Sequence, residues 1–175
     1  VKQLIADAKQ AGALVTFDPN LRPTLWPDEA TMVARINEMA ALADYVLPGL
    51  SEGQRLTGKE TKEEIADFYL GQGSQGVIIK LGPAGAYVKV KTAAGLVEEV
   101  IPGFKLKEVV DTVGAGDGFA VGVITGLLEG LEWPAILKRA NAIGAIQVSH
   151  ISDNENLPTP QRLAEFIAAY EGSGE

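Results

Sequence analysis

Short apolar runs alternate with stretches of helical spacing along the chain, and this alternation limits the fold more than any other feature. Strand-like runs occur at 13–18, 45–47 and 77–81, and a hairpin pattern follows at 86–90 and 96–101. Alternating strands and helices predict an α/β fold, in which a mostly parallel sheet carries helices on both faces. From periodic apolar positions and capping residues we expect helices over 1–11, 28–39, 51–56, 61–70, 115–129, 134–148 and 160–170.

The composition is that of an ordinary globular protein. With 175 residues, 46% of them hydrophobic and 22% charged, the chain suits a single α/β domain over 1–175. A net charge of −8 argues against nucleic acid and membranes as partners, because an anionic surface needs a basic protein face. The absence of Cys excludes disulfides and thiolate metal sites, and no apolar run is long enough to span a bilayer. We therefore expect a cytoplasmic protein.

The segment 111–124, Asp-Thr-Val-Gly-Ala-Gly-Asp-Gly-Phe-Ala-Val-Gly-Val-Ile, carries the clearest chemical signal. Gly114, Ala115 and Gly116 are small enough for bare N–H groups to approach an anion, and the N-terminus of the following helix favours negative charge. Asp117 lies at the mouth of this anion hole, where its carboxylate can take the proton of an attacking hydroxyl. The pattern favours phosphoryl transfer to an alcohol. The alternative is a glycine-rich turn capped by a structural aspartate.

This fourteen-residue string closely resembles the second signature of the ribokinase/phosphofructokinase-B (PfkB) family of carbohydrate kinases. The resemblance implies a ribokinase-like fold, ATP and Mg²⁺ as cofactors, Asp117 as the catalytic base and Gly114–Gly116 as the anion hole. Members of this family are nearly twice as long, and their first half carries another glycine-rich signature and a β lid over the sugar. We therefore expect the C-terminal nucleotide-binding and catalytic part of such a kinase, with the N-terminal half and lid absent.

The loop 17–23, Phe-Asp-Pro-Asn-Leu-Arg-Pro, follows a predicted parallel strand, where open α/β sheets bind ligands. Arg22 offers a planar fork for a carboxylate or hydroxyls, and Asp18 and Asn20 can bind hydroxyls or orient the loop. The alternative pairs Arg22 with a surface acid. The nearby Trp26 is assigned to packing.

The same loop resembles that of 2-keto-3-deoxygluconate kinases, in which the matching Arg meets the sugar-acid carboxylate. Further resemblance at 101–105 and 109–111 makes 2-keto-3-deoxygluconate the favoured substrate. Bacterial and plant fructokinases carry a similar loop, so fructose or another PfkB substrate is the alternative.

Two further segments resemble the nucleotide side of the family. Lys80-Leu81-Gly82-Pro83-Ala84-Gly85 ends a buried strand, and the resemblance implies that Gly82, Gly85 and Lys80 bind ATP. Asn141 matches an Asn that lies beside the adenine in the family. The alternatives are a hairpin turn with a solvated Lys80 and a simple exposed Asn141.

Metal placement departs from the family pattern. Many relatives carry Asn-x-x-Glu where this chain has Gly49-Leu50-Ser51-Glu52, so the resemblance implies only an indirect metal role for Glu52. The alternative is that Glu52 favours a helix N-terminus. The resemblance also implies a monovalent cation, held by backbone near Asp111 and Val113 and by 150–152.

A function of another class stays open: a non-catalytic nucleotide-binding fragment without the sugar-binding lid. The partner expected from the resemblance is a small-molecule sugar or sugar acid. Many relatives dimerise through the lid, which leaves a homo-oligomer open.

Overall fold

The computed structural model describes residues 1–106, 108–149 and 157–172. The chain divides into two compact units, Val1–Leu81 with Tyr87–Glu99, and Gly82–Ala86 with Val100–Glu175. Each unit is described by itself below. That residues 1–175 form one domain stays a prediction.

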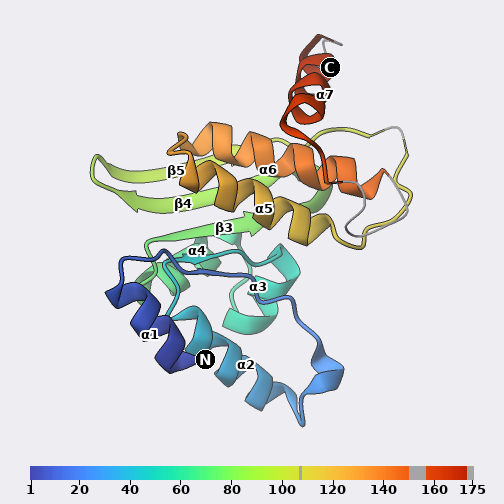
Figure 1. The fold of residues 1–175 in the computed structure, drawn as a ribbon. Coiled ribbons are helices and arrows are strands. Elements are labelled where there is room, and N and C mark those ends of the chain that lie inside the picture. The colour runs from blue at the N-terminus through green and yellow to red at the C-terminus, as the bar shows by residue number, and fades with distance from the viewer. Residues whose placement is uncertain (107, 150–156, 173–175) are drawn as a thin grey trace. The chain divides into compact units, whose positions relative to one another are not determined.

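A five-stranded sheet has the order β1-β2-β3-β4-β5 (Figure 1). Its first three strands are parallel, with Thr16 opposite Tyr45 and Val46 opposite Val77. The last two strands form a hairpin, so the predicted arrangement of parallel strands followed by a hairpin is confirmed. The strands are β1 (Thr16–Phe17), β2 (Tyr45–Val46), β3 (Gly76–Lys80), β4 (Ala86–Thr92) and β5 (Gly95–Ile101).

Each helix predicted from the sequence is present. Thr61 caps its helix as the capping-box pattern predicts: its hydroxyl accepts the Glu64 N–H (3.2 Å), and the Glu64 carboxylate accepts the Thr61 N–H (3.1 Å). Asp28 caps the helix that follows it by accepting the Thr31 N–H (2.7 Å). The helices are α1 (Lys2–Gln10), α2 (Glu29–Ala40), α3 (Leu50–Thr57), α4 (Lys62–Gly71), α5 (Ala115–Leu128), α6 (Trp133–Val148) and α7 (Pro160–Gly172). Short 3₁₀ turns occupy Pro23–Leu25 and Gly82–Ala84.

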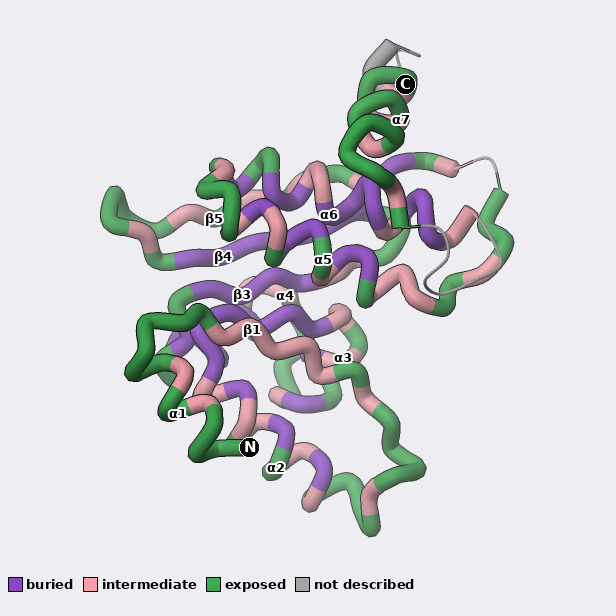
Figure 2. The backbone as a smooth tube through the Cα atoms, viewed as in Figure 1, coloured by how far each residue is buried: buried purple, intermediate pink, exposed green. Residues whose placement is uncertain are grey.

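The core of the first unit lies between β3 and α4. Figure 2 shows the buried run along β3, while α1 is exposed and has no buried residue. Val77 and Ile79 pack with Ile65 and Tyr69 of α4. The apolar positions of α4 thus cover the strand whose continuous apolar run predicted burial.

The first strand is shorter than predicted. The Val15 N–H donates to the Asp44 side chain (2.8 Å) instead of joining the strand ladder, so pairing begins at Thr16. Leu14 belongs to the strand-like run predicted at 13–18, but it precedes β1 and is 55% exposed.

In the second unit, α5 packs closely along α6 (Figure 1). A Cβ added at Gly122 would lie 2.4 Å from the Ala140 Cα atom, so this contact requires glycine. The helix α7 packs on the other part of the unit through Phe166 and Tyr170, which contact Phe104. The packing against α6 holds α5, whose first turn carries the glycine-rich motif.

Candidate active site

The glycine-rich motif forms the start of α5, as predicted. Gly114 is the N-cap and has a left-handed φ of 77°, which favours glycine. Among the described residues, the N–H groups of Gly116 and Asp117 have no hydrogen-bond acceptor. Asp117 is exposed and stands in the first turn of the helix. Free N–H groups, a helix N-terminus and a carboxylate therefore lie together, which is the arrangement that an anion hole with an adjacent base requires.

The chain before this turn is held against the end of α6. The N–H groups of Val110 and Asp111 both point at the Val148 carbonyl, at 2.8 and 3.3 Å. The Asp111 carboxylate accepts the Val113 N–H (3.0 Å). Both contacts restrain the backbone that leads into Gly114, so the start of α5 is held in a fixed shape.

The turn after β3 contains two glycines: both have a positive φ, and Gly85 also lies too close to another segment to carry a Cβ. Gly82 and Gly85 have φ values of +60° and +102°. A Cβ at Gly82 would meet nothing within 4 Å, whereas one at Gly85 would lie 2.1 Å from the Ile101 carbonyl oxygen. The close approach that Gly85 permits is thus to the chain's own segment 101–103, and Gly82 leaves open space beside the turn.

Asn141 is buried in α6 and contacts the same segment. Its side-chain NH₂ donates to the carbonyls of Ile101 and Pro102, both at 3.1 Å. The alternative of a simple exposed Asn141 is wrong, because the residue is only 8% exposed. Gly85 and Asn141 therefore both contact the segment 101–103, which ties the predicted nucleotide turn to α6.

Replacing Asn141 with Ala is expected to destabilise the second unit. Two carbonyl groups lose their donor in a partly buried position, which costs about 1–3 kcal/mol. Affinity for ATP should fall as well if the turn helps to bind it. Thermal unfolding and calorimetric ATP titration measure the two effects. Arg139→Ala, on the same helix, removes only an ion pair with the exposed Glu129 and should cost less than about 1 kcal/mol. An Asn141→Ala variant as stable as the Arg139→Ala variant would show that the Asn141 side chain does not stabilise the segment 101–103.

In the first unit, the loop after β1 is tied to the end of β3. The Lys80 ammonium lies 2.5 Å from one Asp18 carboxylate oxygen, and the other oxygen accepts the Asn20 N–H (3.3 Å). Asn20 has a φ of 41°, unusual for a residue other than glycine. Burial raises the pKa of the Asp18 carboxyl above its usual value, and the Lys80 charge opposes that rise. This ion pair was not foreseen, since the sequence predicted a nucleotide role or solvation for Lys80.

Glu52 binds the same loop from α3. One of its carboxylate oxygens accepts the Leu21 N–H and the other accepts the Gly49 N–H, both at 2.8 Å. The second contact is the helix N-terminal role considered as the alternative for Glu52. Among the described residues, no three His, Cys, Asp or Glu side chains gather as a metal site. An indirect role of Glu52 in metal placement stays a prediction.

Arg22 lies in the same loop and has no carboxylate partner in the described part of the chain. Its guanidinium donates only to the neighbouring Leu21 carbonyl (3.0 Å). The predicted alternative, a pairing with a surface acid, is therefore not found among these residues. An exposed guanidinium without a carboxylate partner remains able to bind the carboxylate of a ligand.

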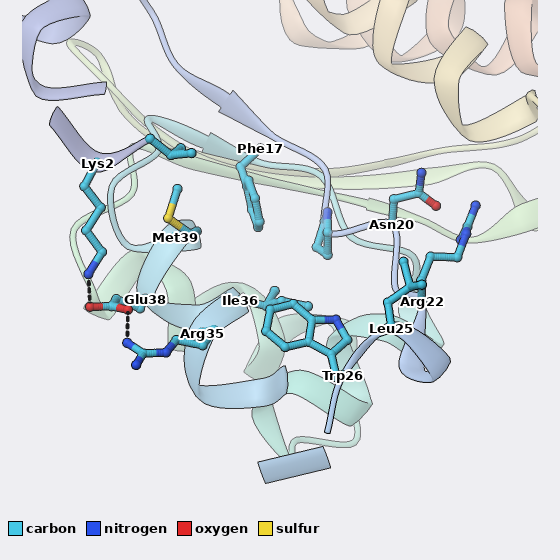
Figure 3. Close-up of a pocket in the computed structure, with 12 residues that line it drawn as sticks. Lys2, Phe17, Asn20, Arg22, Leu25, Trp26, Arg35, Ile36, Glu38 and Met39 are labelled. Carbon is cyan, nitrogen blue, oxygen red and sulfur yellow. Dashed lines mark hydrogen bonds and ion pairs between the residues drawn. The ribbon is translucent and has the colours of Figure 1, made fainter. Parts of the chain in front are cut away.

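The loop also borders a pocket of about 600 Å³ (Figure 3). Lys2 and Arg35 form ion pairs with Glu38 at one side of the pocket, and Asn20 and Arg22 lie at the other side. Trp26 packs beside the buried Met32, Ile36 and Leu56, so its assignment to packing is confirmed. The apolar side chains that line the pocket are Val1, Phe17, Pro19, Leu25, Trp26, Ile36 and Met39.

The predicted site residues thus form two groups, one in each unit. The second unit contains the predicted anion hole, Asp117, the Gly82–Gly85 turn and Asn141. The first unit holds Arg22, Glu52 and Lys80 at the carboxyl ends of neighbouring parallel strands. The cation site predicted near Asp111 and Val113 includes 150–152, which lie outside the described residues. None of the helices within the described ranges combines the length and apolarity needed to cross a membrane.

Comparison with known proteins gives concordant results. The model of the pfkB family carbohydrate kinases matches residues 1–160. The chain is 53% identical over 163 residues to a 2-dehydro-3-deoxygluconokinase of Bacillus subtilis, covering 93% of this chain and 49% of that protein. The name denotes a kinase of 2-keto-3-deoxygluconate.

Solved structures support the same assignment. A PfkB protein from Polaromonas sp. JS666 is 44% identical, with a TM-score of 0.77 over 95% of this chain and 50% of that one. A fructokinase from Vibrio cholerae, solved with fructose, ADP and calcium, is 30% identical, with a TM-score of 0.84 over 94% of this chain and 54% of that one. These neighbours confirm the ribokinase-like fold, and the chain spans about half the length of the relatives it matches. The chain belongs to the PfkB family of carbohydrate kinases.

Proposed function

We propose that this chain takes part in the ATP-dependent phosphorylation of a sugar acid, most closely 2-dehydro-3-deoxygluconate. The observation that carries the chemistry is the start of α5, where the Gly116 and Asp117 N–H groups are free and the Asp117 carboxylate is exposed. The relative from Bacillus subtilis supports the choice of substrate.

In the proposed reaction Asp117 accepts the proton of the sugar hydroxyl. The hydroxyl oxygen forms a bond to the γ-phosphorus of ATP, and the bond from that phosphorus to the β-phosphate oxygen breaks, so ADP leaves with the electron pair. The free N–H groups at Gly116 and Asp117 stabilise the charge on the transferred phosphoryl group. Mg²⁺ would neutralise phosphate charge and, because the described residues offer no carboxylate cage, would be held chiefly by ATP itself.

Arg22 distinguishes a sugar acid from a neutral sugar in this proposal. A free guanidinium can bind a carboxylate through two parallel hydrogen bonds, and fructose has no carboxylate to offer. The Gly82–Gly85 turn would contact the nucleotide directly. Asn141 would contribute indirectly, by holding the segment 101–103 in place.

Replacing Arg22 with Gln should weaken binding of 2-dehydro-3-deoxygluconate by about 10- to 100-fold, the range for hydrogen bonds to charged groups. Fructose binding should not change. Calorimetric titration of both sugars measures this selectivity. Arg55→Gln serves as a matched control, because the Arg55 guanidinium is already paired with Glu29 at 2.7 and 3.0 Å. Equal loss of both sugars in the Arg22 variant would contradict the assignment of the sugar-acid carboxylate to Arg22.

A fructokinase is the alternative within the family, supported by the fructose-bound neighbour from Vibrio cholerae. A nucleotide-binding fragment without catalysis is the alternative of another class.

A further inference from the structure

The carboxyl ends of β1, β2 and β3 are joined by charged side chains that the proposed phosphoryl transfer does not use. Asp18 follows β1, Glu52 lies in the first turn of the helix after β2, and Lys80 ends β3. Parallel strands place these ends at one edge of the sheet. Lys80 is itself paired in register with Gly49, the residue that precedes α3.

Both oxygens of the Glu52 carboxylate accept main-chain N–H groups from two different segments. Leu21 belongs to the loop after β1, 31 residues away, and Gly49 belongs to the turn after β2. Each contact is 2.8 Å and partly buried, the range in which a charged acceptor makes a strong hydrogen bond. Glu52 therefore joins the two loops at this edge.

Gly49 lies close to the Glu52 carboxylate that accepts its N–H. A Cβ at position 49 would lie 3.3 Å from that carboxylate oxygen, so a larger residue there would require the carboxylate to shift by a few tenths of an ångström. The carboxylate is thus packed closely against the backbone of the turn after β2.

The loop 18–22 is consequently held at two points, with Arg22 directly beyond them. The Asp18–Lys80 ion pair fixes its start, and the Leu21–Glu52 hydrogen bond fixes the residue before Arg22. The positive φ of Asn20 between the two points is a conformation that such tethers can hold. A loop fixed in this way presents the Arg22 guanidinium with little ordering cost on binding.

We propose that Glu52 is a positioning residue for sugar-acid binding, which acts by holding the backbone of Leu21 next to Arg22, and that Lys80 supports it through Asp18. This proposal rests on the proposed function, because the group being positioned is the one assigned to the substrate carboxylate. It gives Glu52 and Lys80 a role in holding the loop that carries Arg22.

The test compares Glu52→Gln with Glu64→Gln. In the Glu52→Gln variant, the side-chain amide can accept only one of the two N–H groups and presents a donor to the other. Glu64 is the matched control: it occupies the same position in the first turn of α4 and accepts the Thr61 N–H, while its hydrogen bonds lie within 60–64 and outside the loop 18–22. Amide exchange at Leu21 and Gly49, and calorimetric binding of 2-dehydro-3-deoxygluconate and of Mg·ATP, are measured on each purified chain.

In Glu52→Gln, exchange at Leu21 or Gly49 should quicken and the sugar-acid affinity should fall by about tenfold, while Mg·ATP affinity and its Mg²⁺ dependence stay within about twofold. Glu64→Gln should leave both affinities within about twofold of the wild type. Gly49→Ala, which places a Cβ 3.3 Å from this carboxylate, should lower the sugar-acid affinity less than Glu52→Gln does. A changed Mg²⁺ dependence with unchanged Leu21 exchange would overturn the proposal and favour metal placement.

The failure of the proposed function gives a different result. If the wild-type chain binds no 2-dehydro-3-deoxygluconate, the substrate assignment and the positioning role toward it are both overturned. The exchange rate of the Leu21 amide still decides whether Glu52 holds the loop.

Discussion

Replacing Asp117 with Asn should lower the rate of phosphoryl transfer by about 100- to 10,000-fold, the usual contribution of a general base. The amide keeps the shape of the side chain but cannot take the hydroxyl proton. Because Asp117 stands at a helix N-terminus, loss of its negative charge should not weaken ATP binding. The measurement is the rate at which phosphorylated sugar forms, together with calorimetric ATP affinity.

The control for this variant is Asp7→Asn, which removes an exposed carboxylate of α1 far along the chain. Its turnover should equal that of the wild type. Turnover of the Asp117 variant within about tenfold of the wild type would show that Asp117 is not the base, and the motif would then act only as an anion site.

Replacing Gly122 with Ala should destabilise the α5–α6 pair strongly. The new Cβ would lie 2.4 Å from the Ala140 Cα atom and 2.8 Å from its nitrogen, both main-chain atoms that cannot rotate away. Overpacking of this kind costs about 1–3 kcal/mol or more, which exceeds the gain of about 1 kcal/mol from the helix propensity of Ala. Turnover should fall too, because α5 carries the anion hole in its first turn.

Alanine variants at two other helix glycines, Gly126 and Gly71, serve as comparisons. Denaturant unfolding gives the free energy of unfolding of all three variants. Gly126→Ala should cost less than Gly122→Ala, since its Cβ would meet the movable Ile136 side chain at 2.8 Å. Gly71→Ala should leave stability unchanged or raise it by up to about 1 kcal/mol, because nothing lies within 4 Å of that position. If Gly122→Ala changes the free energy of unfolding no more than Gly71→Ala does, α5 and α6 do not approach each other closely at Gly122 and Ala140.

Local patterns in the sequence predicted most of the fold. The Thr61–Glu64 capping box, the Asp28 cap and the apolar run of β3 each depend on neighbours within a few residues, so periodicity and spacing suffice to find them. The start of α5 belongs to the same class, because small residues before a helix mark its N-terminus. The exposure of Leu14 could not be predicted in this way, because it depends on the residue at which the edge strand β1 begins to pair.

Contacts between distant segments could not be predicted. Glu52 meets Leu21 across 31 residues, Asn141 meets Ile101 across 40, and Lys80 meets Asp18 across 62. Each depends on which strand ends are adjacent in the sheet or which helix faces which loop. The family resemblance pointed to these residues as functional but not to their partners. The structure adds the reason why Asn141 is buried, which is its pair of hydrogen bonds to the carbonyls of Ile101 and Pro102.

Gly85 illustrates the same limit within a motif. A glycine after a buried strand suggests room for a nucleotide, yet the space beside Gly85 is filled by the Ile101 carbonyl and the Gly103 nitrogen. Only the neighbouring Gly82 leaves that room open. A glycine pattern therefore identifies close approach without identifying what approaches.

The most direct test of the proposed function is ADP release from Mg·ATP by the purified chain, with 2-dehydro-3-deoxygluconate and fructose offered separately. We predict release that depends on the sugar acid, is faster than with fructose, and is lost in Asp117→Asn. Faster release with fructose would contradict the assigned substrate. Bound ATP without sugar-dependent ADP release would contradict catalysis by this chain and favour a nucleotide-binding fragment.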